Sequence, residues 1–263
     1  MKKACVLVFA GLDPSGGAGI QADITAITAM GAHALPIITT LTVQDNDRVY
    51  AIHPVDTQLI RQQAQVLAAK MEIAAVKIGI VGNAANAIAI ADVIGELRQS
   101  RPGLPVVLDP VLASGHGDAL SRDDAIAALA PLRKLATVIT PNLPEATLLC
   151  NGERDPQKQG AQLLKDCPNV LIKGGHGSGE IVINHWFEKN VERCWSLPRL
   201  PGSFHGTGCT LASAIAALLA TGHSMEQAIG QAQVWCHGTL EASYVIAEGQ
   251  RIPQRLNLLE EMA

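Results

Sequence analysis

Aromatic residues are scarce in this sequence, because Phe, Tyr and Trp together make up only 3% of its 263 residues. The core must therefore be mainly aliphatic, and hydrophobic residues, chiefly Ala, Leu, Ile and Val, make up 48% of the chain. A chain of this length and composition can bury a large core without disulfides or metal. The mixture favours helices packed on a parallel sheet, whose buried strands are near-continuous aliphatic runs.

The sequence also lacks an excess of positive charge and a long hydrophobic run. Its formal net charge is −4 with both signs interspersed, which excludes the basic footprint of a nucleic-acid-binding protein. The apolar run at 211–220 is interrupted by Ser213 and is shorter than the ~20 residues of a membrane span. The run at 4–10 leads straight into Gly11 and Asp13, which indicates a first core strand rather than a signal peptide. We expect a cytoplasmic protein with no nucleic-acid or membrane partner.

No two cysteines are spaced as Cys-x-x-Cys, although the chain has six of them. This spacing argues against a zinc or redox motif. A chain of this length does not need disulfides, so we interpret the six as reduced thiols that are mostly buried as small apolar side chains.

Strand-like and helix-like segments alternate along most of the chain, which predicts a doubly wound, mostly parallel sheet covered by helices on both faces. The expected strands are 4–10, 34–40, 74–79, 105–109, 136–140 and 170–173. The expected helices are 16–30, 57–70, 84–98, 123–129, 144–149, 157–165, 208–221 and 225–247. Segments 180–187 and 191–197 predict an antiparallel hairpin at the sheet edge. With no repeat or linker, we expect a three-layer αβα α/β fold and one domain over 1–263.

The first expected strand ends in a glycine-rich loop that runs from Gly11 to Gly19 and opens a helix. Glycines let a backbone approach a ligand closely, although a tight strand-to-helix turn explains them equally well. The loop has neither the lysine of a P-loop nor the spacing of a dinucleotide fingerprint. Asp23, early in the helix, either complements the helix dipole or offers a hydrogen bond to an amino-heterocycle.

The strongest signal is the Gly-Thr-Gly turn of Gly206, Thr207 and Gly208, which opens an apolar helix. The first N–H groups of a helix have no internal partner, so such a turn can form an anion hole for a phosphoryl group. Cys209 would lie on the first helical turn, where we expect a lowered thiol pKa. The alternative for Cys209 alone is a small buried residue.

Polar side chains also follow three successive expected strands. Asp109, then Asn142 with Glu145, and then Lys173 lie at strand ends, which share one edge of a parallel sheet. The three oxygen-bearing side chains suit Mg²⁺ or its waters. Two acids, an amide and a lysine at one edge of a sheet suit an enzyme that transfers a phosphoryl group, because this reaction needs precise positioning, a metal ion and positive charge.

The sequence resembles the hydroxymethylpyrimidine kinase/phosphomethylpyrimidine kinase family of thiamine biosynthesis, within the ribokinase-like superfamily. The similarity spans about 6–248. The motifs that carry it are Gly11 to Asp23, Thr42-Val43-Gln44, Asp109-Pro110-Val111, Thr140 to Ala146, Lys173 to His176 and His205 to Thr210. The resemblance implies a ribokinase-like kinase that uses ATP and Mg²⁺ on 4-amino-5-hydroxymethyl-2-methylpyrimidine and on its monophosphate. It also implies a homodimer.

The resemblance further implies a role for each candidate site residue. Gly11, Asp23, Gln44 and Gly79 would bind the pyrimidine. Lys173, Asn142 and Gly175 would bind the nucleotide, and Asp109 and Glu145 would hold Mg²⁺. Cys209, at the position of the ribokinase catalytic Asp, would be the base, and Gly206, Thr207 and Gly208 would form the anion hole.

This sequence departs from the family pattern in two loops near the expected phosphates. Residues 112–117 carry no lysine, and Ser203-Phe204 replaces the usual Asn-Thr. A phosphorylated substrate would favour positive charge, so the missing lysine bears on the second phosphorylation. Two alternatives stay open: a pyridoxal or pyridoxine kinase of the same fold, and a non-catalytic pyrimidine-binding relative.

Overall fold

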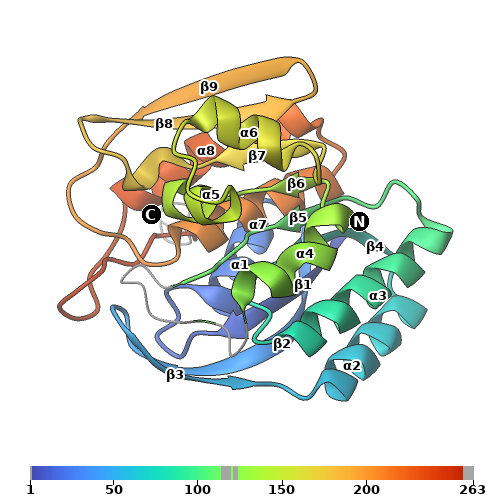
Figure 1. Cartoon of the computed structure of the whole chain (residues 1–263). Helices are drawn as coiled ribbons and strands as arrows, with labels where there is room; N and C mark the ends of the chain where they lie inside the picture. The colour runs from blue at the N-terminus through green and yellow to red at the C-terminus, as the bar shows by residue number, and fades with distance from the viewer. Residues whose placement is uncertain (1, 114–119, 121–123, 257–263) are drawn as a thin grey trace.

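The computed structural model describes residues 2–113, 120 and 124–256, and within these ranges nine strands form one sheet (Figure 1). The strand order is β3-β2-β1-β4-β5-β6-β7-β8-β9. Strands β2, β1, β4, β5, β6 and β7 are parallel, whereas β3 and the β8–β9 hairpin are antiparallel additions at the two edges. The strands are β1 (Cys5–Leu12), β2 (His33–Gln44), β3 (Val49–Pro54), β4 (Ile73–Ile78), β5 (Val106–Leu108), β6 (Val138–Ile139), β7 (Asn169–Ile172), β8 (Ile181–Glu188) and β9 (Val191–Pro198).

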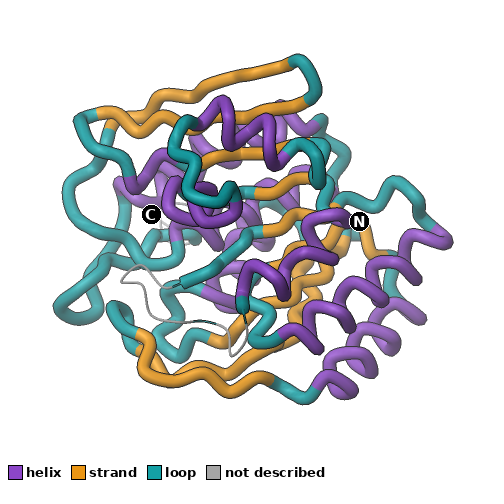
Figure 2. Tube along the Cα trace, viewed as in Figure 1, coloured by secondary structure: helices purple, strands orange, loops and turns teal. Residues whose placement is uncertain are grey.

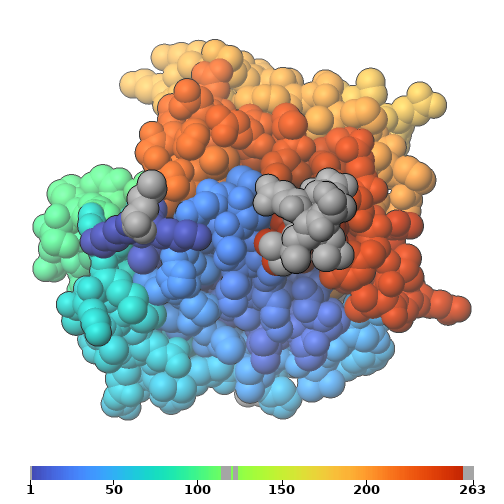
Figure 3. Space-filling model, turned by 180° about the vertical axis from the view of Figure 1, so that it is seen from behind, coloured from blue at the N-terminus to red at the C-terminus, as the bar shows by residue number. Residues whose placement is uncertain are grey.

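Helices cover both faces of this sheet, as the doubly wound prediction required (Figures 1 and 2). They are α1 (Gly19–Ala29), α2 (Thr57–Lys70), α3 (Ala84–Ser100), α4 (Ala125–Leu135), α5 (Leu143–Leu149), α6 (Pro156–Leu163), α7 (Thr207–Ala220) and α8 (Met225–Glu241), with a short 3₁₀ turn η1 at Gly174–His176. Because side chains alternate along a strand, β1 feeds two cores. Leu7 and Phe9 pack with α2 to α6, and Val6 and Val8 pack with α1, α7 and α8. Figure 3 shows the second face from behind, with α1 in blue beside α7 and α8 in orange and red.

Local sequence signals explain several element boundaries. Asp56 caps α2, because its carboxylate accepts hydrogen bonds from the N–H groups of Gln58 and Leu59. Asn142 and Glu145 form a capping box at the start of α5, in which each side chain accepts from the other's backbone N–H. Asn142 and Glu145 therefore stabilise the start of α5, in addition to lying at the end of a strand.

Three elements end at least four residues away from the predicted position. Helix α4 continues to Leu135 rather than ending at residue 129. β2 continues to Gln44 rather than ending at Thr40, and it pairs with β3, a strand that the sequence analysis missed. This ribbon has Leu41 and Val43 exposed and therefore lacks the continuous buried run that identified the other strands. Helix α8 ends at Glu241 and not at residue 247, because the chain reverses and Tyr244 pairs with Ile252. The predicted helix start at residue 123 lies outside the described residues.

The parallel strands place their carboxyl ends along one edge of the sheet, and this edge faces the glycine-rich loops. Among the described residues, no helix combines the length and apolar character needed to span a membrane.

Candidate active site

A single cavity of about 610 Å³ lies beyond the carboxyl ends of the parallel strands, and most of the predicted site residues line it. Those residues are Gly11, Gln44, Asp109, Asn142, Glu145, Lys173, Gly175, Gly206, Thr207, Gly208 and Cys209. They come from loops that are far apart in the sequence, so the fold brings the predicted motifs together. Asp23 and Gly79 do not line it.

The Gly-Thr-Gly turn begins α7 at the floor of this cavity. Gly206 is the N-cap and has a left-handed backbone, with φ 74°. A Cβ at this position would also lie 2.1 Å from the carbonyl oxygen of Gly17, so both conformation and space require glycine. Within the described chain no side chain caps this helix, so its first N–H groups are available to an anion in the cavity.

Asp109, Glu145 and Lys173 form a charged cluster beside this turn, since a Cβ at Gly208 would lie 3.1 Å from Lys173 Nζ and 3.4 Å from Asp109 Oδ2. Lys173 Nζ lies 2.7 Å from Asp109 Oδ1, and the Thr140 hydroxyl donates to the same oxygen at 3.2 Å. Burial raises the pKa of Glu145 to about 7; Lys173 opposes the rise and the Asp109 charge adds to it. The carboxyl oxygens of these two buried acids suit a divalent cation that prefers oxygen ligands.

Asp23 does not face the cavity, which differs from the predicted contact with substrate. It is fully buried in α1, where Lys77 Nζ donates to its two carboxylate oxygens at 2.8 and 2.9 Å and the Ser213 hydroxyl donates at 2.7 Å. Burial by itself disfavours the charge of Lys77, but the nearby Asp23, Cys209 and Asp109 raise its pKa above the ordinary value. Both carboxylate oxygens of Asp23 are thus paired inside the protein, away from the residues that line the cavity.

Gly79 also lies outside the cavity wall and packs against the same ion pair. A Cβ at this position would lie 2.9 Å from Lys77 Nζ. Its N–H donates to the Phe9 carbonyl at 2.8 Å, which joins β4 to β1. Glycine here leaves room for the buried lysine.

Cys209 lies on the first turn of α7, between the cavity and the buried pair. Burial raises the pKa of its thiol to about 11; Lys77 opposes the rise, and Asp23 and Asp109 add to it. The expected lowering of this pKa is therefore wrong, because removal from water raises the thiol pKa by more than Lys77 lowers it.

Asp13 and His205 lie in the family motifs but had no predicted role. His205 Nε2 lies 2.8 Å from Asp13 Oδ2, and Asp13 also accepts from the N–H groups of Ser15 and Ala18. The pair joins the glycine-rich loop after β1 to the turn before α7. Burial would raise the pKa of Asp13, but the hydrogen bonds from His205 and Ser15 outweigh it and hold this pKa at about 2.

Arg255 is a second connection that no local sequence signal could have identified. This nearly buried side chain donates to the Gly17 carbonyl at 2.5 Å and to the Thr210 hydroxyl at 2.8 Å. It lies 238 residues after Gly17, beyond every motif in the chain. Arg255 and His205 therefore hold the two glycine-rich segments in one arrangement.

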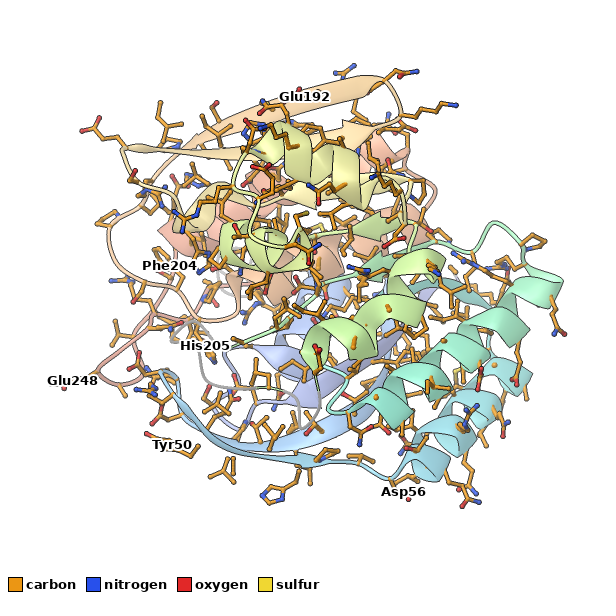
Figure 4. All side chains as sticks on the ribbon, in the orientation of Figure 1. Tyr50, Asp56, Glu192, Phe204, His205 and Glu248 are labelled. Atoms are coloured by element: carbon orange, nitrogen blue, oxygen red, sulfur yellow. The ribbon has the colours of Figure 1, made fainter. Side chains whose placement is uncertain are left out.

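The loop after β7, which contains Gly175, is fixed by residues from the outer hairpin and beyond. Asn184 Oδ1 accepts the Gly174 N–H at 2.8 Å, and Arg199 donates to the Gly175 carbonyl at 2.6 Å. Of the altered loops, Ser203 and Phe204 line the cavity beside His205 (Figure 4), whereas residues 114–117 lie outside the described residues.

Solved structures share this architecture and define the class as ribokinase-like α/β kinases. The pyridoxal kinase of Bacillus subtilis superposes with a TM-score of 0.84 at 26% identity, covering 97% of this chain and 98% of that one. A phosphomethylpyrimidine kinase from Clostridium difficile 630 has a TM-score of 0.76 at 30% identity, covering 90% of this chain and 100% of that one.

The sequence itself identifies the family. Residues 13–253 match the family model for phosphomethylpyrimidine kinase, so this chain belongs to that family. It is 37% identical over 260 residues to the hydroxymethylpyrimidine/phosphomethylpyrimidine kinase of Rhizobium meliloti, with 94% of each chain covered. The enzyme of the same name from Escherichia coli is 33% identical, with 96% of each chain covered. The resemblance inferred from the motifs is confirmed.

The first prediction concerns the buried ion pair. Lys77→Met should lower the free energy of unfolding by about 3–5 kcal/mol, because it leaves the Asp23 carboxylate buried without its cation. Replacing both partners, Lys77→Met with Asp23→Leu, should recover much of this loss, and the exposed Lys70→Met should change stability by no more than about 0.5 kcal/mol. Urea unfolding measures all three. A Lys77→Met variant as stable as the parent would contradict the pair's role.

The second prediction concerns acid stability. Folded Asp13 has a pKa of about 2 against an ordinary 3.8, so the unfolded chain binds this proton first as the pH falls. The stabilisation is complete above 3.8 and is lost as the pH falls toward 2. Asp13→Asn should flatten the free energy of unfolding against pH in this window, and His205→Gln should flatten it in part. An unchanged slope in Asp13→Asn would exclude this account.

Proposed function

We propose that this chain transfers the γ-phosphoryl group of ATP to the hydroxymethyl group of 4-amino-5-hydroxymethyl-2-methylpyrimidine, and then phosphorylates the monophosphate, in thiamine biosynthesis. The observation that carries the proposal is one cavity holding the uncapped N-terminus of α7, the Asp109–Lys173 pair and Cys209. Family membership and the names of the relatives support the substrate. The B. subtilis pyridoxal kinase structure, an ADP complex, supports the nucleotide.

The two ends of the cavity have different chemistry in this proposal. Gln44, at the end of β2, presents an amide donor and an amide acceptor, which match the edge of an aminopyrimidine, and Gly11 also lines the cavity. At the other end Lys173, Asn142 and Gly175 bind the nucleotide phosphates. Mg²⁺ held by Asp109 and Glu145 would neutralise phosphate charge.

The N–H groups of Thr207, Gly208 and Cys209 act on the transferring group by stabilising its equatorial oxygens. Cys209, as the thiolate, accepts the proton of the attacking hydroxyl. Burial raises the thiol pKa to about 11, and Lys77 opposes this rise. Burial by itself would lower the pKa of Lys173, but the nearby Asp109 and Glu145 raise this pKa above its ordinary value. Lys173 is therefore a cation at neutral pH.

A pyridoxal kinase is the second candidate, because the B. subtilis pyridoxal kinase superposes with the high TM-score of 0.84. Higher sequence identity to the pyrimidine kinases, 33–37% against 26%, favours the pyrimidine. The amide of Gln44 also matches an aminopyrimidine better than a pyridine ring with a phenolic oxygen. A single domain over 1–263, a homodimer and a cytoplasmic location stay predictions.

The third prediction tests this function directly. The purified protein should release ADP when given ATP, Mg²⁺ and the hydroxymethylpyrimidine, with a higher kcat/KM than for pyridoxal. Chelating Mg²⁺ should abolish ADP release. Gln44→Leu should lower kcat/KM for the pyrimidine by about 10- to 100-fold, because the polar edge of the bound pyrimidine would lose its hydrogen-bond partner. A higher kcat/KM for pyridoxal would show that the proposed substrate is wrong and that the protein is a pyridoxal kinase. Pyrimidine binding without ADP release would indicate the non-catalytic alternative.

The fourth prediction concerns Cys209. Cys209→Ala should lower kcat by about 10²–10⁴-fold, the usual contribution of a general base, without loss of folding. Activity of the parent should rise with pH above neutrality, because the thiol pKa is about 11. Cys209→Asp restores a base of lower pKa and should retain more activity than the alanine variant, with its maximum at lower pH. An alanine variant with parental kcat would remove Cys209 from the chemistry.

A further inference from the structure

The outer hairpin carries a cluster of three potential metal ligands on one face. His185 in β8 lies directly opposite Cys194 in β9, as a cross-strand pair of the antiparallel register. Glu192 precedes Cys194 by two residues, and side chains two apart along a strand point to the same side. The hairpin geometry therefore places one nitrogen, one oxygen and one sulfur ligand together.

The distances among the three ligand atoms match those around a tetrahedral ion. His185 Nδ1 lies 3.2 Å from Cys194 Sγ and 3.4 Å from Glu192 Oε1, and the sulfur lies 3.9 Å from that oxygen. A tetrahedral zinc ion with ligands at about 2.0–2.3 Å holds neighbouring ligand atoms about 3.3–3.6 Å apart. Shifts of a few tenths of an ångström would bring the three onto one ion. Among the described residues this is the one group of three His, Cys or acidic side chains placed so closely.

Surrounding contacts hold two of the ligands in place. The His185 ring stacks on Phe187, with ring centroids 6.1 Å apart and planes 5° from parallel. Phe187 in turn packs against α6, where Gly160 leaves space for its ring. The Gln157 amide of α6 donates to Glu192 Oε1 at 3.3 Å. Outer contacts of this kind orient the ligands of metal sites.

We propose that His185, Glu192 and Cys194 bind one thiophilic divalent cation of the zinc class. Imidazole and thiolate ligands favour such an ion over Mg²⁺ or Ca²⁺, which take oxygen ligands. Cys194 and Glu192 are exposed and His185 is partly exposed, so solvent can complete the coordination. The site is separate from the cavity, since Figure 4 shows Glu192 on the outer hairpin and Phe204 and His205 far from it. It does not depend on the proposed kinase activity.

The bound ion would stiffen the hairpin that holds the loop after β7. Asn184 precedes His185 and points to the opposite face of β8, where it accepts the Gly174 N–H at 2.8 Å. Its amide also donates to Gln233 of α8 at 2.7 Å. An ion that joins β8 to β9 would therefore stabilise β8, and β8 in turn fixes the loop after β7 through Asn184.

The fifth prediction tests the site with Co²⁺, which reports thiolate ligation by its absorption. Metal-free protein in excess Mg²⁺ should bind one Co²⁺ per chain, with a thiolate-to-cobalt charge-transfer band that Zn²⁺ displaces. Cys194→Ser should abolish this band and weaken Co²⁺ binding at least ~10-fold, since even loss of an outer-shell partner costs about 10–100-fold. His185→Gln and Glu192→Gln should each weaken Co²⁺ binding as well. These two variants test the same site if Cys194→Ser does not fold.

Two other thiols provide matched controls. Cys5→Ser changes a partly exposed thiol at the start of β1, and Cys209→Ser removes the thiol beside the cavity. Both variants should keep the band, and Cys194→Ser should keep the parental rate of any turnover. No band in the parent protein, or a band that survives Cys194→Ser, would overturn the proposal.

Discussion

The whole site depends on a backbone contact between two glycine-rich segments from opposite ends of the chain. Gly206 can begin α7 in a left-handed conformation only because it has no side chain, and the Gly17 carbonyl occupies the space where a Cβ would be. The Asp13–His205 pair and Arg255 fix this contact by hydrogen bonds from both sides. The direction of the first α7 amides, and hence any anion hole, follows from that contact.

Charge is arranged in two layers around the same turn. On the cavity side, Lys173 pairs with Asp109, and burial raises the pKa of the nearby Glu145 carboxyl to about 7. Behind, Lys77 and Asp23 form a pair with no exposure to solvent. Cys209 lies between the layers, so its proton affinity depends on both. A cation in the layer on the cavity side therefore adds to the influence of Lys77 on the same thiol.

Much of this architecture could be predicted from the sequence, because buried parallel strands and glycine-rich turns leave local signals. The edge hairpin and the grouping of the strand-end residues were predicted for that reason. β3 was missed, since its ribbon is exposed and has no continuous apolar run. Asp23 was predicted to face the ligand because helix position alone does not reveal a buried lysine partner from another strand. Arg255 has a role only through tertiary contacts, and the Cys209 pKa depends on burial that no local pattern encodes.

The span between Gly17 and Arg255 also constrains when the site can form during synthesis. The two residues are 238 positions apart, and ribosomes add about 5–20 residues per second, so the partner of the Gly17 carbonyl emerges roughly 10–50 s after it. The nascent sheet can assemble from β1 onward during that interval. The contact that orients the Gly-Thr-Gly turn, in contrast, can be completed only after Arg255 has been made, which is later than every strand of the sheet.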